Sequence, residues 1–164
     1  MSFDSFLGLV DSPAYVVTVA AEGRRAGCLV GFASQCSMSP ELFMVWLSQE
    51  NHTYRLARHA DFLAVHLLPQ RHDLAERFGA RCSAETDKFA GLDWTEGPDG
   101  TPLLTDAAAC FVGRIVERLD SGADGDHTGF LLAPVRTRLH PDAPAEVLRL
   151  SQAADIPAGH PVPG

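Results

Sequence analysis

The chain has 164 residues, which is the usual size of one domain with one hydrophobic core. Hydrophobic residues make up 46% of the chain and charged residues 21%, a composition that excludes a mainly disordered or collagen-like protein. Thirteen Lys and Arg against 21 Asp and Glu give a net charge of −8, which argues against a nucleic-acid partner but leaves room for a nucleotide cofactor on a local basic patch.

The first ten residues contain no targeting signal. They lack the basic start and the continuous apolar stretch of a signal peptide, and no later stretch approaches the roughly 20 apolar residues that a spanning helix needs. The sequence therefore predicts a cytoplasmic protein that does not contact a membrane.

Three short apolar runs in the N-terminal part predict strands. Residues 14–20 are β-branched and apolar, and the Gly and charges of residues 21–25 predict a hairpin turn into a return strand over residues 27–32. Residues 42–47 form a third apolar run, too short for a helix. Between these strands, residues 33–40 are rich in Ser and end in Pro, so we expect a crossing loop without regular sheet pairing.

Helix and strand alternate briefly in the middle of the chain. Residues 53–60 show the spacing of a short amphipathic helix, with Asn51 or His52 as its N-cap. A strand is expected over residues 62–68, followed by a helix over residues 73–78 that ends at a glycine.

The C-terminal half predicts turns and then two long strands. Residues 91–102 carry Gly and Pro signals for turns. Residues 107–119 and 130–139 read as long antiparallel strands joined by a turn over residues 120–126. From about residue 141 a Pro-rich tail is expected to lie on the surface or on a partner subunit.

About six strands with few and short helices indicate a mainly β fold, a barrel or a sandwich. A Rossmann fold is disfavoured, because no G-x-G-x-x-G follows a predicted strand. We expect residues 1–164 to form a single domain of this kind.

Cysteine and histidine spacing indicates no metal site. The cysteines form no Cys-x-x-Cys pair, which favours reduced, mostly buried thiols over a disulfide framework or a zinc site. The seven histidines show neither His-x-x-x-His nor His-Glu-x-x-His spacing. The four cysteines are Cys28, Cys36, Cys82 and Cys110.

The segment over residues 26–40 resembles the signature of the flavin reductase-like family of FMN-binding split barrels, with Gly27, Ser34, Ser37 and Pro40 in matching places. A strand that leads into a Ser-rich segment offers backbone N–H groups and hydroxyls to a flavin without steric bulk. The alternative is an ordinary loop whose serines satisfy its own backbone. The resemblance assigns the following residues to the flavin: Leu29, Val30, Ser34, Gln35 and Ser37.

Three further segments match the same family in the same order. Asn51 and Thr53 fall in a polar stretch at the start of a helix, where N–H groups can meet a phosphate; the alternative is a plain helix cap. Lys88, in Asp-Lys-Phe, would border the flavin, or it is a solvated Lys beside a packed Phe. His127, in Gly-Asp-His, would orient the nicotinamide or move a proton, or it packs on the barrel rim.

The resemblance implies a split β-barrel with short inserted helices, usually a homodimer, that transfers a hydride from NADH or NADPH to FMN or FAD. In such proteins the reduced flavin often supplies a separate monooxygenase. Three positions depart from the family pattern. Ala26 stands where the family usually has Asn, Leu29 where it usually has Thr, and Gln49 where a Lys or Arg often meets the flavin phosphate. Arg24, Arg25 or Arg55 could supply the missing charge. The alternatives are a non-catalytic flavin or haem carrier on the same barrel, and an interaction domain that binds through its tail.

Overall fold

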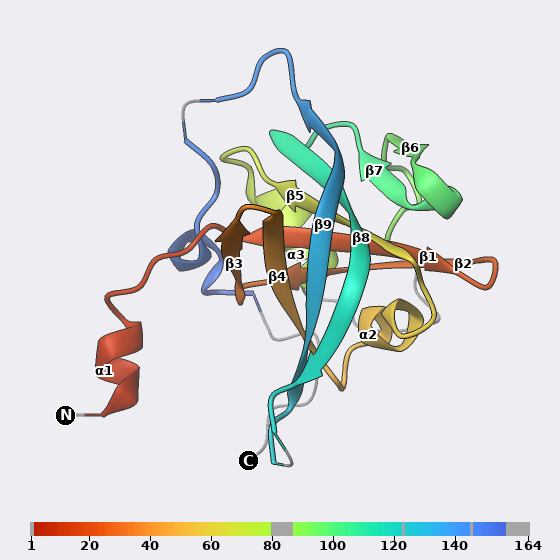
Figure 1. Ribbon diagram of the computed structural model, residues 1–164. Coiled ribbons are helices and arrows are strands. Elements are labelled where there is room, and N and C mark those ends of the chain that lie inside the picture. Colours follow the sequence, from red (N-terminus) through yellow and green to blue (C-terminus); the bar gives the residue numbers. More distant parts are fainter. Residues whose placement is uncertain (1, 80–86, 123, 145, 157–164) are drawn as a thin grey trace.

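The computed structural model describes residues 2–79, 87–122, 124–144 and 146–156 (Figure 1). Its centre is a seven-stranded antiparallel sheet with the strand order β2-β1-β5-β8-β9-β4-β3. The strands of this sheet are β1 (Tyr15–Ala21), β2 (Arg24–Val30), β3 (Ala33–Met38), β4 (Glu41–Ser48), β5 (Phe62–Leu67), β8 (Ala109–Asp120) and β9 (His127–Leu139). The remaining elements are β6 (Trp94–Glu96), β7 (Pro102–Leu104), α1 (Phe3–Leu7), α2 (His52–Ala57), α3 (His72–Gly79), η1 (Pro98–Gly100) and η2 (Leu150–Ala153).

The predicted mainly β fold with short helices is confirmed. The first hairpin forms as expected, with Tyr15 opposite Val30 and Ala21 opposite Arg24. Its turn residues Glu22 and Gly23 both have positive φ, 55° and 73°, which is the geometry of the two-residue turns that match the twist of a hairpin. The two long antiparallel strands also form.

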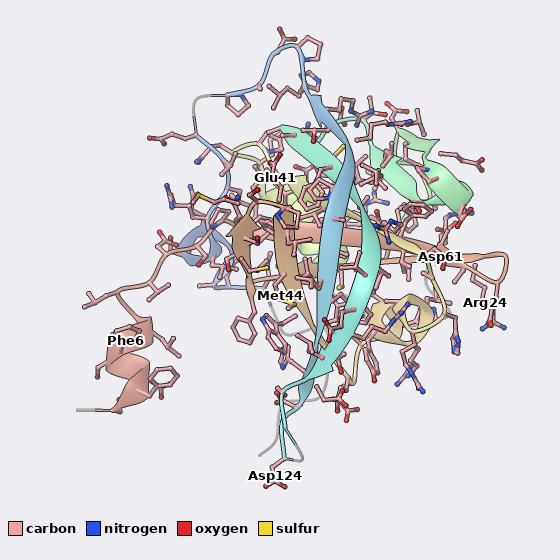
Figure 2. The ribbon with its side chains drawn as sticks, viewed as in Figure 1. Phe6, Arg24, Glu41, Met44, Asp61 and Asp124 are labelled. Carbon is pink, nitrogen blue, oxygen red and sulfur yellow. The ribbon has the colours of Figure 1, made fainter. Side chains whose placement is uncertain are left out.

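Three sequence predictions differ from the structure. Residues 33–40 are not an unpaired loop: β3 pairs with β4 along its length, with a bulge between Gln35 and Ser37. The strand is mostly exposed at the sheet edge, so its serines cost little there. The turn region over residues 91–102 contains β6 and leads into its partner β7, and β9 begins at His127 rather than at Phe130. Helix α1 was not expected from the sequence; it stands apart from the sheet with Phe6 extending from it (Figure 2).

Two groups of buried side chains hold these elements together. One fills the inside of the curved sheet and includes Val17, Val45, Leu47 and Phe130. The other packs α3 and η2 against the outside of β1 and includes the side chains of Phe78, Phe89, Leu148 and Ala153. The described part of the Pro-rich tail therefore lies on the protein's own surface, where Leu148 is 3% exposed.

Cysteine burial follows the prediction in part. Cys28 and Cys110 are buried thiols, whereas Cys36 is exposed on β3. Cys82 lies outside the described residues. Among the described residues, no three His, Cys, Asp or Glu side chains are grouped so that they could hold a metal ion.

We expect Gly27→Ala to lower the free energy of unfolding by about 1–3 kcal/mol, because the added methyl group overpacks the core. A Cβ at Gly27 would lie 2.7 Å from Cε1 of Phe78 and 3.3 Å from Cγ2 of Thr18. The matched control is Gly8→Ala, whose Cβ would make only ordinary contacts, 3.5 Å from the Asp4 carbonyl. Chemical denaturation measures both; equal stability of the two variants would contradict the packing argument.

Candidate functional site

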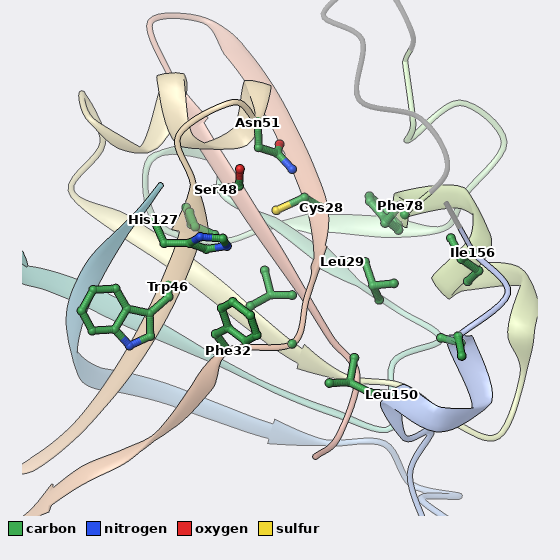
Figure 3. A pocket seen from close by; sticks show the side chains of 16 residues that line it. Cys28, Leu29, Phe32, Trp46, Ser48, Asn51, Phe78, His127, Leu150 and Ile156 are labelled. Atoms are coloured by element: carbon green, nitrogen blue, oxygen red, sulfur yellow. The ribbon is translucent and has the colours of Figure 1, made fainter. Parts of the chain in front are cut away.

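A pocket of about 310 Å³ opens where the ends of β2 and β4 meet the start of β9 (Figure 3). Strand β2 contributes Cys28 to Val30, and β4 contributes Trp46 to Ser48. The far side is formed by the end of α3, with Phe78 and Gly79, and by the segment that carries η2. Residues far apart in the sequence thus converge on one cavity, as is typical of a small-molecule site.

Aromatic side chains form one wall of this pocket. The rings of Phe32 and His127 lie with their centroids 5.0 Å apart, and Trp46 lies beside them (Figure 3). Phe32 is 59% exposed, although it is a large apolar side chain. Exposed rings at the mouth of a pocket provide a flat apolar surface on which a planar ligand can stack.

His127 is fixed by its neighbours. It begins β9 opposite Ser48 of β4, its Nδ1 lies 2.7 Å from Oδ1 of Asp126, and its side chain is 19% exposed. The carboxylate accepts a hydrogen bond from Nδ1 and thereby sets the direction of the ring, which places the opposite edge of the imidazole at the pocket.

Two polar side chains lie close to the aromatic wall. Asn51 is the N-cap of α2: its Oδ1 accepts a hydrogen bond of 2.9 Å from the backbone N–H of Thr53. Ser48 accepts a hydrogen bond from the N–H of Glu50 through its Oγ, at 3.3 Å. Asn51 is only 8% exposed and still lines the pocket, so capping the helix and facing a ligand are compatible roles for this side chain.

The structure brings four of the candidate residues to this pocket, namely Leu29, Val30, Asn51 and His127. Thr53 is buried in the first turn of α2 behind Asn51. The other four candidates do not line the pocket: Ser34, Gln35 and Ser37 lie on β3, and Lys88 is buried.

Lys88 has a structural position of its own. Its Nζ donates hydrogen bonds to the carbonyl oxygens of Gly27, at 3.1 Å, and of Phe78, at 2.9 Å. These bonds tie β2 to the end of α3, the two elements that carry Leu29 and Gly79 into the pocket. The buried ammonium therefore supports the pocket wall from behind.

Positive charge gathers next to Asn51. The pKa of His52 is lowered, first by partial burial and then by the positive charges of Arg55, Arg24 and Lys88. Figure 2 shows Arg24 at the tip of the β1–β2 hairpin. The net-negative chain thus has a local basic cluster beside His52, which we define as Arg24 and Arg55. Lys88 adds positive charge from its buried position behind the pocket wall.

Arg25 and Gln49, the other two residues that the sequence analysis considered for the flavin phosphate, make contacts elsewhere. Arg25 lies 4.9 Å above the ring of Trp94 and pairs with Asp87 at 3.5 Å. Gln49 donates a hydrogen bond from Nε2 to the hydroxyl of Thr128, at 3.2 Å.

The sequence analysis missed several lining residues, among them Phe32, Trp46, Ser48, Leu150 and Ile156. Trp46 was not recognised because it lies within an apolar run. It stands between the buried Val45 and Leu47, so its side chain must point to the opposite face of β4. That alternation is the one local signal that could have identified it.

The family described as "Flavin reductase like domain" matches residues 7–154. The chain belongs to this family. A ferric-chelate reductase (NAD(P)H) of Archaeoglobus fulgidus is 30% identical to it over 132 residues, which cover 79% of this chain and 76% of that protein. The reductase subunit HsaB of a flavin-dependent monooxygenase from Rhodococcus jostii is 28% identical over 126 residues, 76% of this chain and 62% of HsaB.

Solved structures agree with the family assignment. The NADH:FAD oxidoreductase SgcE6 of Streptomyces globisporus C-1027 matches with a TM-score of 0.80 at 23% identity, over 92% of this chain and 88% of that chain. SgcE6 has also been solved in complex with NAD and FAD fragments. The likeness confirms the predicted split-barrel fold of this flavin reductase-like chain. Within the part of the chain that the structure describes, no helix is long and apolar enough to cross a membrane.

Proposed function

We propose that this flavin reductase-like chain is an NAD(P)H-dependent flavin reductase and that the pocket between β2, β4 and β9 holds the flavin ring. The observation that carries the proposal is the pocket itself: an aromatic wall of Phe32, Trp46 and His127 beside the polar groups of Ser48 and Asn51. A flavin has the matching form, a planar ring system with polar edges, so that its face can stack and its edge can receive hydrogen bonds.

The size of the pocket fits this assignment. A volume of about 310 Å³ is at the lower end of the range for small-molecule sites, enough for a ring system but not for a whole dinucleotide. The phosphate-bearing part of the ligand would therefore extend out of the pocket. The basic cluster next to Asn51 is the nearest positive charge described above, and it is the group that we assign to the phosphate.

In this reaction the residues of the chain bind and orient the flavin and the nicotinamide, and they exclude water from the pocket. The cofactors would supply the chemistry: NAD(P)H would give a hydride to a bound flavin, a proton would complete the reduction, and the oxidised nicotinamide would leave. Because the two rings must be aligned face to face, positioning is the main contribution of the protein. His127, held by Asp126 at the pocket mouth, is placed to hydrogen-bond the nicotinamide carboxamide or to deliver the proton.

Anaerobic titration of the purified protein tests the proposal. We expect FMN or FAD to bind with quenching of the Trp46 fluorescence, and the yellow absorbance to be lost when NADH or NADPH is added in stoichiometric amounts. A protein that binds flavin but oxidises neither nicotinamide would instead be a carrier, and a protein that binds haem and no flavin would point to the haem alternative. Either result overturns the reductase assignment.

Arg55→Ala is expected to weaken FMN binding by about 10-fold at low salt, because a charge-assisted contact to a phosphate contributes about 1.5–3 kcal/mol and is partly screened at an exposed position. Riboflavin, which has no phosphate, should bind both proteins equally. Arg58→Ala is the matched control, since Arg58 is on the same helix end but lies over the ring of Tyr54 at 5.8 Å. An equal loss for FMN and riboflavin would contradict the phosphate assignment.

Two further proposals concern assembly. By analogy with its relatives, one of which is a monooxygenase reductase subunit, we propose that the reduced flavin passes to a separate flavin-dependent monooxygenase. We also propose a homodimer, in which a second copy covers exposed apolar side chains such as Phe3 and Phe6. Light scattering of the purified chain measures the dimer directly, and a monomer at micromolar concentration would exclude it.

A further inference from the structure

The segment over residues 149–156, which we call the strap, forms one side of the pocket. It carries η2, and its side chains Leu150 and Ile156 face the cavity from the side opposite the aromatic wall (Figure 3). The backbone of the main body approaches the strap closely. A Cβ at Gly31 would lie 2.9 Å from Leu150, and a Cβ at Gly79 would lie 2.6 Å from Ile156, so glycine at both places lets the strap lie against the end of β2 and the end of α3.

The first half of the strap is fastened by many hydrogen bonds to the N-terminal segment. The N–H of Leu150 donates to the Ser12 carbonyl at 2.9 Å. The Asp11 carboxylate accepts hydrogen bonds from the N–H and the hydroxyl of Ser151, at 3.1 and 2.9 Å. The backbone carbonyl of Asp11 accepts a hydrogen bond from the guanidinium of Arg149 at 2.8 Å. Backbone and side chains together fix this half.

The second half is held by packing of Ala153 and Ile156 against the core group that contains Phe78 and by hydrogen bonds between exposed side chains. Asp155 accepts a hydrogen bond from Nε2 of His72 at 2.9 Å, and Gln152 donates to Gln70 at 2.7 Å. Both His72 and Asp155 are well exposed, and an exposed pair adds little to stability. The strap is therefore held at Ser151 by backbone and side-chain hydrogen bonds, whereas near Ile156 it is held by apolar packing and by the exposed pair of His72 and Asp155.

His72 lies among acidic groups. Asp155 of the strap faces its Nε2, and Glu76 of α3 lies 3.6 Å from its Nδ1. The neighbouring charged side chains form ion pairs among themselves. Arg71 pairs with Asp73 at 2.8 Å and lies 3.9 Å from Asp106. The hydrogen bond to Asp155, together with the charges of Asp155 and Glu76, raises the pKa of His72. In mildly acidic solution protonated His72 therefore forms an ion pair with the Asp155 carboxylate. This ion pair is lost as the pH rises through the raised pKa of His72.

We propose that the strap is a ligand-contacting wall whose second half is latched by His72 and Asp155, and that this latch sets how fast the flavin leaves the pocket. The inference rests on the proposed function and adds to it. With the latch closed, Ile156 lies against the pocket beside Phe78 (Figure 3). With the latch open, the end of the strap can move away from Gly79 and uncover that side of the ring. Asp11 and His72 are then positioning residues, and Leu150 and Ile156 contact the ligand.

Flavin release tests the latch at two pH values. For the wild type we expect the FMN dissociation rate, followed by recovery of Trp46 fluorescence, to rise about 5-fold between about pH 6 and about pH 9, as His72 loses its charge. Asp155→Asn and His72→Gln should release FMN at the fast rate at both pH values. His72→Arg should restore slow release at the higher pH, because its charge is permanent.

Asp73→Asn is the matched control, since it removes a carboxylate from the same helix without touching the strap. Hydrogen exchange of the amides in residues 149–156 reports the latch without any ligand, and its protection should follow the same order of variants and pH. If the wild type binds no flavin, the proposed function fails while the exchange data still decide the latch. If flavin binds and is reduced, but release and exchange are alike in the wild type and in Asp155→Asn, the latch is wrong.

Discussion

We expect replacement of His127 with alanine to lower kcat/KM for the nicotinamide nucleotide by about 100-fold, the lower end of the range for a positioned acid–base group. The imidazole is the one titratable side chain placed by Asp126 in the aromatic wall, with its ring centroid 5.0 Å from that of Phe32. Its loss removes a hydrogen-bonding partner for the carboxamide and opens the mouth of the pocket to water. Flavin affinity should change by less than about 3-fold, since the remaining ring surfaces persist. Steady-state kinetics with varied NADH and NADPH measure the effect.

Two variants separate chemistry from packing at this position. His127→Phe keeps a ring against Phe32 but has no polar atom, so we expect it to be as impaired as alanine. Asp126→Asn keeps a hydrogen-bonding side chain but removes the carboxylate that fixes Nδ1, and a loss of about 10-fold is expected. Wild-type kinetics in the Phe variant would show that His127 only packs in the wall. His140→Ala, outside the pocket, serves as the unaffected control.

Local patterns were sufficient for most of the fold. The apolar runs that became β1, β4 and β5 are short and bounded by turn residues, and Gly79 is the last residue of α3. Strand β3 was missed because its residues have no apolar alternation of their own. Its pairing is supplied by β4, and a strand at a sheet edge can have a polar sequence since one face and one edge meet water.

The site was only partly visible in the sequence. Asn51 could be identified because a helix cap is a local device, and His127 because it lies in a short motif. Nothing local indicates that Leu150 or Ile156 faces the pocket between β2, β4 and β9, since their contacts with Gly31 and Gly79 join residues far apart in the chain. The assignment of Lys88 illustrates the same limit: the sequence could not show that its ammonium group is bound to two backbone carbonyls.

Acid should destabilise this protein through His66, which is fully buried in β5. Its Nε2 accepts a hydrogen bond of 3.0 Å from the N–H of Leu104, so Nδ1 carries the proton and donates to the carbonyl of Val16, also at 3.0 Å. Burial lowers the pKa of His66 from 6.5 to about 4. The hydrogen bond to Val16 opposes this shift, and the positive charge of Arg138 adds a smaller lowering. A second proton on Nε2 would remove the acceptor that Leu104 needs.

The sign of the effect follows from this depressed pKa. Between pH 6.5 and about 4 the unfolded chain binds the proton and the folded chain does not, so the free energy of unfolding falls as the pH falls. His66 alone should account for about 3 kcal/mol of that loss by about pH 4. His66→Gln, whose amide can donate to Val16 and accept from Leu104, should lose about 1–2 kcal/mol at neutral pH and become less sensitive to acid.

Urea denaturation at a series of pH values from about 4 to about 8 measures this difference, with His59→Gln, at an exposed position, as the control that keeps the wild-type slope. Identical slopes for the wild type and His66→Gln would show that His66 titrates normally in the folded protein. The same variant should bind flavin with wild-type affinity at neutral pH, because His66 joins β1, β5 and β7 and does not line the flavin pocket. We therefore expect the acid sensitivity of stability and the proposed pH dependence of flavin release to come from two different histidines, His66 and His72, and a substitution at either one to leave the other effect in place.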